Sequence, residues 1–247
     1  MREDVDEDLA VTSYATAQRP GDRAFQCDAT AVYTTPDGTR AYVLLDGVGD
    51  TPAVRSWTRT AARRLARAAA EHADAEAGLR AEYDHYVADP ARTAGHGLPC
   101  AAAVVAAHVP GGLFSVAWSG DARAYLLLDG HLRLLTEDHN ARRACDGDRN
   151  LITACLGEAR SDEETEQIWG HPAIEYLRGP ARPGWLLLAS DGAYEPHEDA
   201  GHDLAGYLTG DPHAAAERLV DDAVRRAHEL SDPYADNASV LVARITC

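Results

Sequence analysis

The sequence predicts an α+β fold that contains much antiparallel sheet. Short apolar runs of strand type come in pairs joined by turn residues, and separate stretches have helical character. Strands that pair with their neighbours in sequence, with the helices kept apart from them, are typical of this class. We find no internal repeat and no domain boundary. We therefore expect residues 1–10 to form a frayed acidic tail and residues 11–247 to form one domain.

The first half of the chain predicts a strand pair followed by helix. Residues 31–45 read as two strands around the turn at Asp37-Gly38, because Asp-Gly between apolar runs is a strong hairpin signal. Residues 52–88 are rich in Ala and Arg and have no internal Pro, so they predict one helix or two. Four arginines recur there every four residues and indicate a solvated face. They are Arg55, Arg59, Arg63 and Arg67.

The second half predicts further strands and a closing helix–strand pair. Strands are expected at 101–109 and 113–119, and a hairpin at 123–136 turns at Asp129-Gly130. Residues 137–150 look irregular. The remaining elements are a buried strand at 185–189, a helix at 213–230 and a last strand at 238–245.

Charge and composition exclude several classes of function. The formal net charge of −17 disfavours nucleic acids and anionic membranes, which both require clustered Lys and Arg. No apolar run approaches the roughly 20 residues of a membrane helix, and the acidic start is unlike a secretion signal. We therefore expect a cytoplasmic protein that binds neither. A phosphorylated substrate remains compatible, because bound divalent cations reverse the local field of an acidic site.

Cysteine and histidine spacing gives no zinc or disulfide pattern. The five cysteines form no CxxC pair, which predicts reduced structural thiols. The stretch His197-Glu198 with His202 misses the HExxH motif by one residue, so we interpret these histidines as loop residues.

The informative residues are aspartates at the ends of apolar runs. Asp46-Gly47 follows Tyr42–Leu45, and Asp191-Gly192 follows the run at 186–190. A carboxylate at the tip of a buried strand is costly unless a cation or hydrogen bonds compensate it. Oxygen ligands of this kind suit Mg²⁺ or Mn²⁺. Asp-Gly is also an ordinary turn signal, so these two pairs alone leave a metal site and plain turns equally open.

Three more motifs extend the series. Ser119-Gly120-Asp121-Ala122-Arg123 precedes the predicted hairpin, Glu137-Asp138-His139-Asn140 closes it, and Asp236-Asn237 opens the last strand. In this order, with the two Asp-Gly pairs, the set resembles the metal-dependent type 2C (PPM) protein serine/threonine phosphatases of bacterial type. The resemblance runs from about Gly21 to Ile245.

The resemblance implies a fold, a cofactor and a set of roles. The fold would be two stacked antiparallel sheets flanked by helices, with a two-metal centre of Mn²⁺ or Mg²⁺ at one end. The reaction would be hydrolysis of phosphoserine and phosphothreonine on proteins by water activated between the metals. Arg23 would hold the phosphate. The implied metal ligands are Asp28, Asp46 (bridging both ions), the Gly47 carbonyl, Asp191 and Asp236, with Asp121 holding a third ion in bacterial members.

The chain departs from the family pattern at several positions. Gln26 and Cys27 replace the Asn-Glu expected before Asp28, which weakens the expected support for a metal-bound water. Val48 stands where animal members have a His, and Ala122 replaces the Ser of the GDSR motif. Asp50 adds a carboxylate to the first metal loop, and the flap between His139 and Asn150 is short. We interpret His139 as a structural, hydrogen-bonding histidine.

These departures leave two other hypotheses open. Cys27, Ala122 and the short flap are compatible with a phosphatase-fold binding module that has lost catalysis. The short flap is also compatible with a metal-dependent phosphatase of small phosphorylated molecules.

Overall fold

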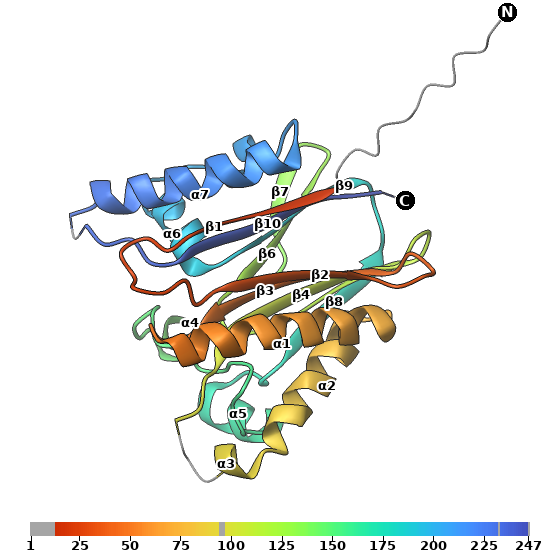
Figure 1. Cartoon of the computed structure of the whole chain (residues 1–247), viewed down its shortest axis with the longest axis vertical. Coiled ribbons are helices and arrows are strands. Elements are labelled where there is room, and N and C mark those ends of the chain that lie inside the picture. Colours follow the sequence, from red (N-terminus) through yellow and green to blue (C-terminus); the bar gives the residue numbers. More distant parts are fainter. Residues whose placement is uncertain (1–12, 94–96, 232, 247) are drawn as a thin grey trace, which may run out of the picture.

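Two five-stranded antiparallel sheets form the centre of the molecule (Figure 1). The computed structural model describes residues 13–93, 97–231 and 233–246, so the tail expected at 1–10 lies outside the described residues. Sheet A runs β1 (Tyr14–Arg19), β10 (Ala238–Ile245), β9 (Gly184–Ala189), β6 (Arg123–Leu128), β7 (His131–Leu134). Sheet B runs β2 (Ala29–Thr34), β3 (Arg40–Gly47), β4 (Ala101–His108), β5 (Leu113–Ser119), β8 (Glu175–Pro180).

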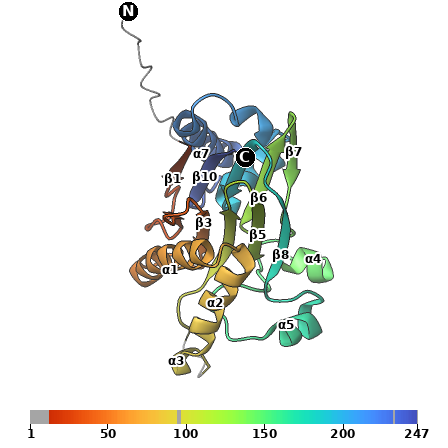
Figure 2. The same cartoon turned by 90° about the vertical axis from the view of Figure 1, so that its right-hand side faces the viewer.

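Helices cover the outer face of each sheet, which gives four layers (Figures 1 and 2). Helices α1 (Pro52–Glu71) and α2 (Ala75–Val87) pack on sheet B, and α6 (Asp191–Asp199) and α7 (Pro212–Glu229) pack on sheet A. Shorter helices are α3 (Pro90–Thr93), α4 (Ala141–Cys145), α5 (Asp162–Trp169) and the 3₁₀ helix η1 (Leu204–Tyr207). None of the helices described here is long and apolar enough to cross a membrane.

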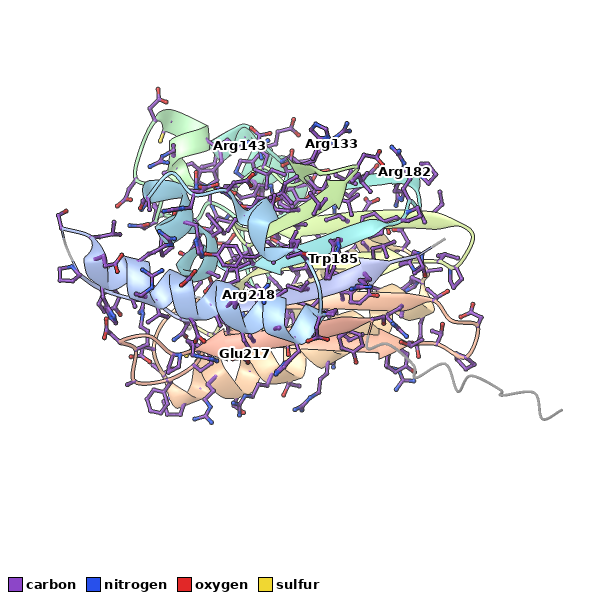
Figure 3. The ribbon with its side chains drawn as sticks, turned by 90° about the horizontal axis from the view of Figure 1, so that it is seen from above. Arg133, Arg143, Arg182, Trp185, Glu217 and Arg218 are labelled. Carbon is purple, nitrogen blue, oxygen red and sulfur yellow. The ribbon has the colours of Figure 1, made fainter. Side chains whose placement is uncertain are left out.

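Helix α7 is tied to the edge of sheet A by ion pairs as well as by apolar packing. Arg19 of β1 binds Glu217 and Asp221 of α7. In the view from above, Glu217 lies on the side of α7 that faces β1 (Figure 3). These exposed pairs add little stability, and the buried apolar face of α7 holds the layer in place.

Alternation along the central strands divides the core into three apolar layers. In β3, Tyr42 and Leu44 point between the sheets, whereas Val43 and Leu45 point toward α1 and α2. Strands β9 and β10 alternate in the same way between the inter-sheet layer and α6–α7. Strands buried on both faces read as continuous apolar runs. This is why the runs before Asp46 and Asp191 lack polar alternation.

Most predicted elements are confirmed. The strand pairs, the two helices within 52–88, the closing helix and the last strand occur within a few residues of the expected bounds. The interpretation of His197 as a loop residue is wrong, because His197 lies in α6, is fully buried and contacts the Leu219 carbonyl oxygen at 3.2 Å. Pro196 normally argues against a helix interior, which hid α6 from sequence reasoning. The irregular segment 137–150 contains the short helix α4.

Gly78 allows α1 and α2 to approach closely. A Cβ at this position would lie 2.3 Å from the Ala69 Cα atom. In an exposed helix, Gly to Ala would stabilise by about 1 kcal/mol, but here the contact is backbone and cannot yield cheaply. We expect Gly78→Ala to lower the free energy of unfolding by about 1–3 kcal/mol in a urea titration. Gly206→Ala, where nothing lies within 4 Å of the new Cβ, is the control. A neutral or stabilising Gly78→Ala would contradict this packing.

Candidate functional site

The predicted site residues meet in one pocket at the end of the sandwich where β3, β9 and the start of β10 come together. The pocket has a volume of about 720 Å³. The predicted residues that line it are Arg23, Asp46, Gly47, Asp121, Asp191 and Asp236. Asp28 does not line it and is buried behind it, where it interacts electrostatically with Asp191 and Asp236. Segments more than 200 residues apart in sequence therefore supply one carboxylate cluster.

Close backbone packing around Gly47 positions Asp46. Asp46 follows Tyr42 and Leu44 on the inter-sheet face of β3, so its carboxylate lies at the open end of the space between the sheets. A Cβ on Gly47 would lie 2.5 Å from the Cys27 carbonyl oxygen. Glycine at this position lets the chain just before Asp28 pass directly against the end of β3.

At the second Asp-Gly pair, glycine again allows two backbone segments to pack closely. Asp191 begins α6 directly after β9, and its carboxylate accepts a hydrogen bond from the Gly192 N–H at 2.5 Å. A Cβ on Gly192 would lie 2.4 Å from the Asn237 carbonyl oxygen and 3.2 Å from the Asp236 Cβ. The start of α6 therefore touches the start of β10, which brings Asp191 beside Asp236.

A tight turn after β5 holds Asp121. Gly120 has a φ of +118°, and a Cβ there would lie 2.4 Å from the Ala102 Cβ, so only glycine fits. The Tyr194 hydroxyl of α6 donates to the Asp121 carbonyl oxygen at 3.1 Å. Arg123 pairs with Asp138 through two bonds of 2.8 and 2.7 Å and lies 3.9 Å from the Tyr194 ring centre. These contacts fix the turn relative to α6.

His139 supports the same turn from behind. Its Nδ1 accepts from the Gly120 N–H at 3.3 Å, so its Nε2 carries the proton and donates to Glu175 at 2.9 Å. Burial lowers the pKa of His139, and its ring stacks on His171 at 4.2 Å. Burial alone would raise the pKa of Glu175, but hydrogen bonds from His139 and Arg143 lower it to about 2. The structural interpretation of His139 fits these contacts.

Burial and mutual repulsion raise the pKa values of the clustered carboxyl groups. Burial is the largest cause for Asp28, Asp46, Asp121 and Asp191, and negative neighbours add to it. Asp46 and Asp191 lie within hydrogen-bonding distance of each other. Burial and their mutual repulsion therefore oppose the ionisation of both carboxyl groups when no cation is bound.

Asp28 gives the clearest sign that a cation belongs here. Both of its carboxylate oxygens are buried and have no hydrogen-bond partner of good geometry, and the nearby Ser239 and Ser190 hydroxyls lower its pKa only against the larger effect of burial. The nearby Ser190 hydroxyl is occupied, because it donates to backbone carbonyls and accepts from the Ser239 N–H. A buried carboxylate without partners is costly. An all-oxygen donor set of this kind fits Mg²⁺ or Mn²⁺.

Some of the predicted metal ligands are paired with other side chains of the pocket. Arg23 binds both Asp236 oxygens, at 2.7 and 2.5 Å, and Asp46 lies beside Asp191. Within the described ranges, no three His, Cys, Asp or Glu side chains already meet in metal-binding geometry. The residues fit divalent cations in type and position. They would have to exchange these pairings for metal contacts.

Several departures from the family pattern have structural explanations. Asp50 accepts hydrogen bonds from the Ala24 and Phe25 N–H groups at 2.9 and 2.7 Å, so it anchors the loop that presents Arg23. Cys27 is fully buried, burial raises the pKa of its thiol, and its N–H donates to Asn237 at 2.7 Å. Gln26 accepts from the Asp28 N–H at 3.0 Å. Cys27 therefore packs inside the protein and does not line the pocket.

Sequence reasoning missed Glu195, Asp199 and Arg149, three charged residues in the pocket. Asp191, Glu195 and Asp199 follow one another at four-residue spacing on α6, and all three line the pocket. Arg149 from the short flap binds Glu195 at 3.2 Å and Asp199 at 2.7 Å across it. Burial, with the Asp191 charge second, raises the pKa of Glu195 to about 7. The i, i+4, i+8 spacing was the available signal, but it is informative only once α6 is known to be a helix.

Solved structures share the fold of this chain. PppA of Pseudomonas aeruginosa, described as a key regulatory component of T6SS, matches with a TM-score of 0.71 and 23% identity over 96% of this chain and 99% of that chain. The Mycobacterium tuberculosis serine/threonine phosphatase PstP/Ppp gives 0.67 and 24% over 95% and 98%. A serine/threonine phosphatase of S. agalactiae gives 0.71 and 18% over 94% and 99%. This is the type 2C phosphatase fold.

The type 2C phosphatase fold confirms the expected pair of stacked antiparallel sheets flanked by helices. No protein-family model matches the sequence, and no curated protein matches it. At such low identity the fold is established, and the chemistry of the pocket rests on its own residues.

The raised carboxyl pKa values predict pH-dependent metal binding. The metal-free cluster keeps protons well above the usual carboxyl range, and a divalent cation has to displace them. We therefore expect the affinity for Mn²⁺ to rise with pH between 6 and 8 and binding to release protons. Calorimetric titration in two buffers of different ionisation enthalpy measures both quantities.

Asp28→Asn supplies the control for this prediction. The change removes a carboxyl group whose ionisation burial opposes and whose pKa is about 8, so above that pH the metal-free variant should have a higher Tm than the native protein, and its Mn²⁺ binding should be weaker. An Mn²⁺ affinity that is independent of pH, with no proton release, would contradict the raised carboxyl pKa values of the cluster.

Proposed function

We propose that this chain is a divalent-metal-dependent phosphatase that hydrolyses phosphoserine and phosphothreonine on proteins, within residues 11–247 and in the cytoplasm of a bacterium. The observation that carries the proposal is the convergence of five aspartates from separate segments, four that line one pocket and Asp28 buried directly behind it. They are Asp28, Asp46, Asp121, Asp191 and Asp236. The fold and the unpaired oxygens of Asp28 support it.

The chain would hold two Mn²⁺ or Mg²⁺ ions through its carboxylates. Asp46 lies among the other aspartates and would bridge the ions, with the Gly47 carbonyl, Asp28, Asp191 and Asp236 completing the set. Asp121 lies near Asp191 and would hold a third ion. When bound, such ions supply an acidified water and a positive field for phosphoryl oxygens. Before they bind, the protein holds its carboxylates desolvated in one cluster, and the Arg23–Asp236 ion pair has to give way to metal contacts.

Arg23 would bind and orient the phosphoryl group. Its guanidinium presents Nε and Nη2 side by side to Asp236, the same two-donor face that recognises a phosphate. Asp50 anchors the backbone on its C-terminal side, which fixes the direction from which Arg23 enters the pocket. Val48 lines the pocket but offers no proton, so the leaving oxygen takes its proton from water or another residue.

The two other hypotheses are less well supported. A module that had lost catalysis would not be expected to retain every core aspartate in place, and Cys27 packs inside without disturbing Asp28. A phosphatase of small molecules shares the same pocket chemistry. A substrate panel separates it from the proposal.

Replacing one core aspartate tests the proposed function. We expect Mn²⁺-dependent hydrolysis of para-nitrophenyl phosphate and of a phosphothreonine peptide to fall at least about a hundredfold in Asp46→Asn and Asp191→Asn, because outer-shell changes alone cost about 10–100-fold. The circular dichroism spectrum should be unchanged. Asp129→Asn, at an exposed hairpin turn with φ of 51°, is the matched control, and it should keep full activity.

Three outcomes would count against the proposal. Full activity in Asp191→Asn would contradict the assignment of that residue. A folded native protein without turnover in Mn²⁺ or Mg²⁺ would favour the binding module. Faster turnover of small phosphate esters than of every phosphopeptide would favour the small-molecule hypothesis.

A further inference from the structure

Exposed apolar side chains gather at the mouth of the pocket. Among the large apolar residues that the described structure exposes, three line the pocket directly, and they are Val48, Leu230 and Tyr234. A fourth, Leu151, lies between two lining residues, Asn150 and Ile152. We call Val48, Leu151, Leu230 and Tyr234 the apolar rim.

The rim residues are too exposed to act as core. Their exposed fractions are 43% for Val48, 55% for Leu151, 36% for Leu230 and 49% for Tyr234. They come from three separate segments: the loop after β3, the residue that follows the short flap, and positions 230 and 234 between α7 and β10. These segments lie together at the left end of the sandwich in Figure 1. Exposed apolar residues around a polar pocket indicate a surface that another molecule covers.

We propose that the apolar rim binds apolar residues that flank the phosphorylated residue of a protein substrate, and so selects for them. This inference rests on the proposed function, because the residues that the rim binds belong to the same substrate chain as the phosphoryl group bound in the pocket. The floor is made of carboxylates and Arg23, and the rim stands outside it. A pocket of about 720 Å³ has room for neighbouring residues as well as the phosphoryl group.

Tyr234 connects the rim to the phosphate-binding group. Its ring centre lies 5.7 Å from the Arg23 guanidinium carbon, and half of the side chain is exposed. A residue next to the phosphorylated one would therefore meet an aromatic surface. Leu230, at the end of α7, extends the same side of the pocket.

The negative charge of the pocket disfavours the alternative that substrates carry acidic residues beside the phosphorylated one. The pocket lining has six acidic side chains and two basic ones, and both basic ones are paired with acids. The acidic residues are Asp46, Asp121, Asp191, Glu195, Asp199 and Asp236, and the basic ones are Arg23 and Arg149. The net charge of −17 adds a repulsive field. Apolar flanking residues fit the rim without this repulsion.

Two phosphothreonine peptides that differ only in their flanking residues test the proposal. One has Leu on both sides of the phosphothreonine, and the other has Ser. We expect the native protein in Mn²⁺ to prefer the Leu peptide in kcat/KM by about tenfold, the effect of covering one apolar side chain. The preference should fall to about threefold or less in Leu151→Ser and in Leu230→Ser.

Leu113→Ser is the matched control. Leu113 lies at the start of β5, is 53% exposed and does not line the pocket, so its loss should leave the peptide preference unchanged. Equal kcat/KM for the two peptides in the native protein would overturn the rim proposal. So would a preference that survives in both rim variants, or one that Leu113→Ser reduces equally.

Hydrolysis of para-nitrophenyl phosphate separates this inference from the function on which it rests. Turnover of this small ester without any peptide preference overturns the rim and leaves the phosphatase proposal intact. Absence of turnover of the ester and of both peptides in Mn²⁺ and Mg²⁺ overturns both.

Discussion

The structure of the pocket depends on keeping several carboxyl groups close together and away from water. Burial raises the pKa values of Asp28, Asp46 and Asp191, and their mutual repulsion adds to the effect. Such a cluster opposes folding unless other interactions hold it. Here the holding interactions are the apolar layers of the two sheets, which bring strand ends to fixed positions whatever charge those ends carry.

Glycines next to the aspartates let the neighbouring segments pack closely enough to form the site. Gly47 lets the backbone before Asp28 approach β3, Gly192 lets α6 approach β10, and Gly120 turns the chain at Asp121. In each case a Cβ would lie within 2.5 Å of another segment, so any side chain would push that segment away from the aspartate beside the glycine. The glycines next to the acidic residues are therefore part of the site's geometry. In each of these Asp-Gly pairs, the aspartate supplies the carboxylate, and the glycine lets the neighbouring segment pack against it.

Sequence could predict the fold and the aspartates because both follow from local pattern. Strands buried on two faces have continuous apolar runs, and the aspartates come directly after two of these. Sequence could not predict α6, because Pro196 opposes a helix locally and only packing against α7 outweighs that preference. Without α6, the four-residue spacing of Asp191, Glu195 and Asp199 could not be recognised. Nor could sequence show that Asp50 binds backbone amides, because those contacts join separate loops.

The pairing of Arg23 with Asp236 connects the two halves of the proposed chemistry. Arg23 is the group expected to bind phosphate, Asp236 is expected to bind metal, and without either ligand they neutralise each other. A cation on Asp236 removes the partner of Arg23, and a phosphate on Arg23 frees Asp236. Each ligand therefore lowers the free-energy cost of binding the other, and linkage requires that this effect be mutual. The same ion pair also limits the repulsion within the cluster while no cation is bound.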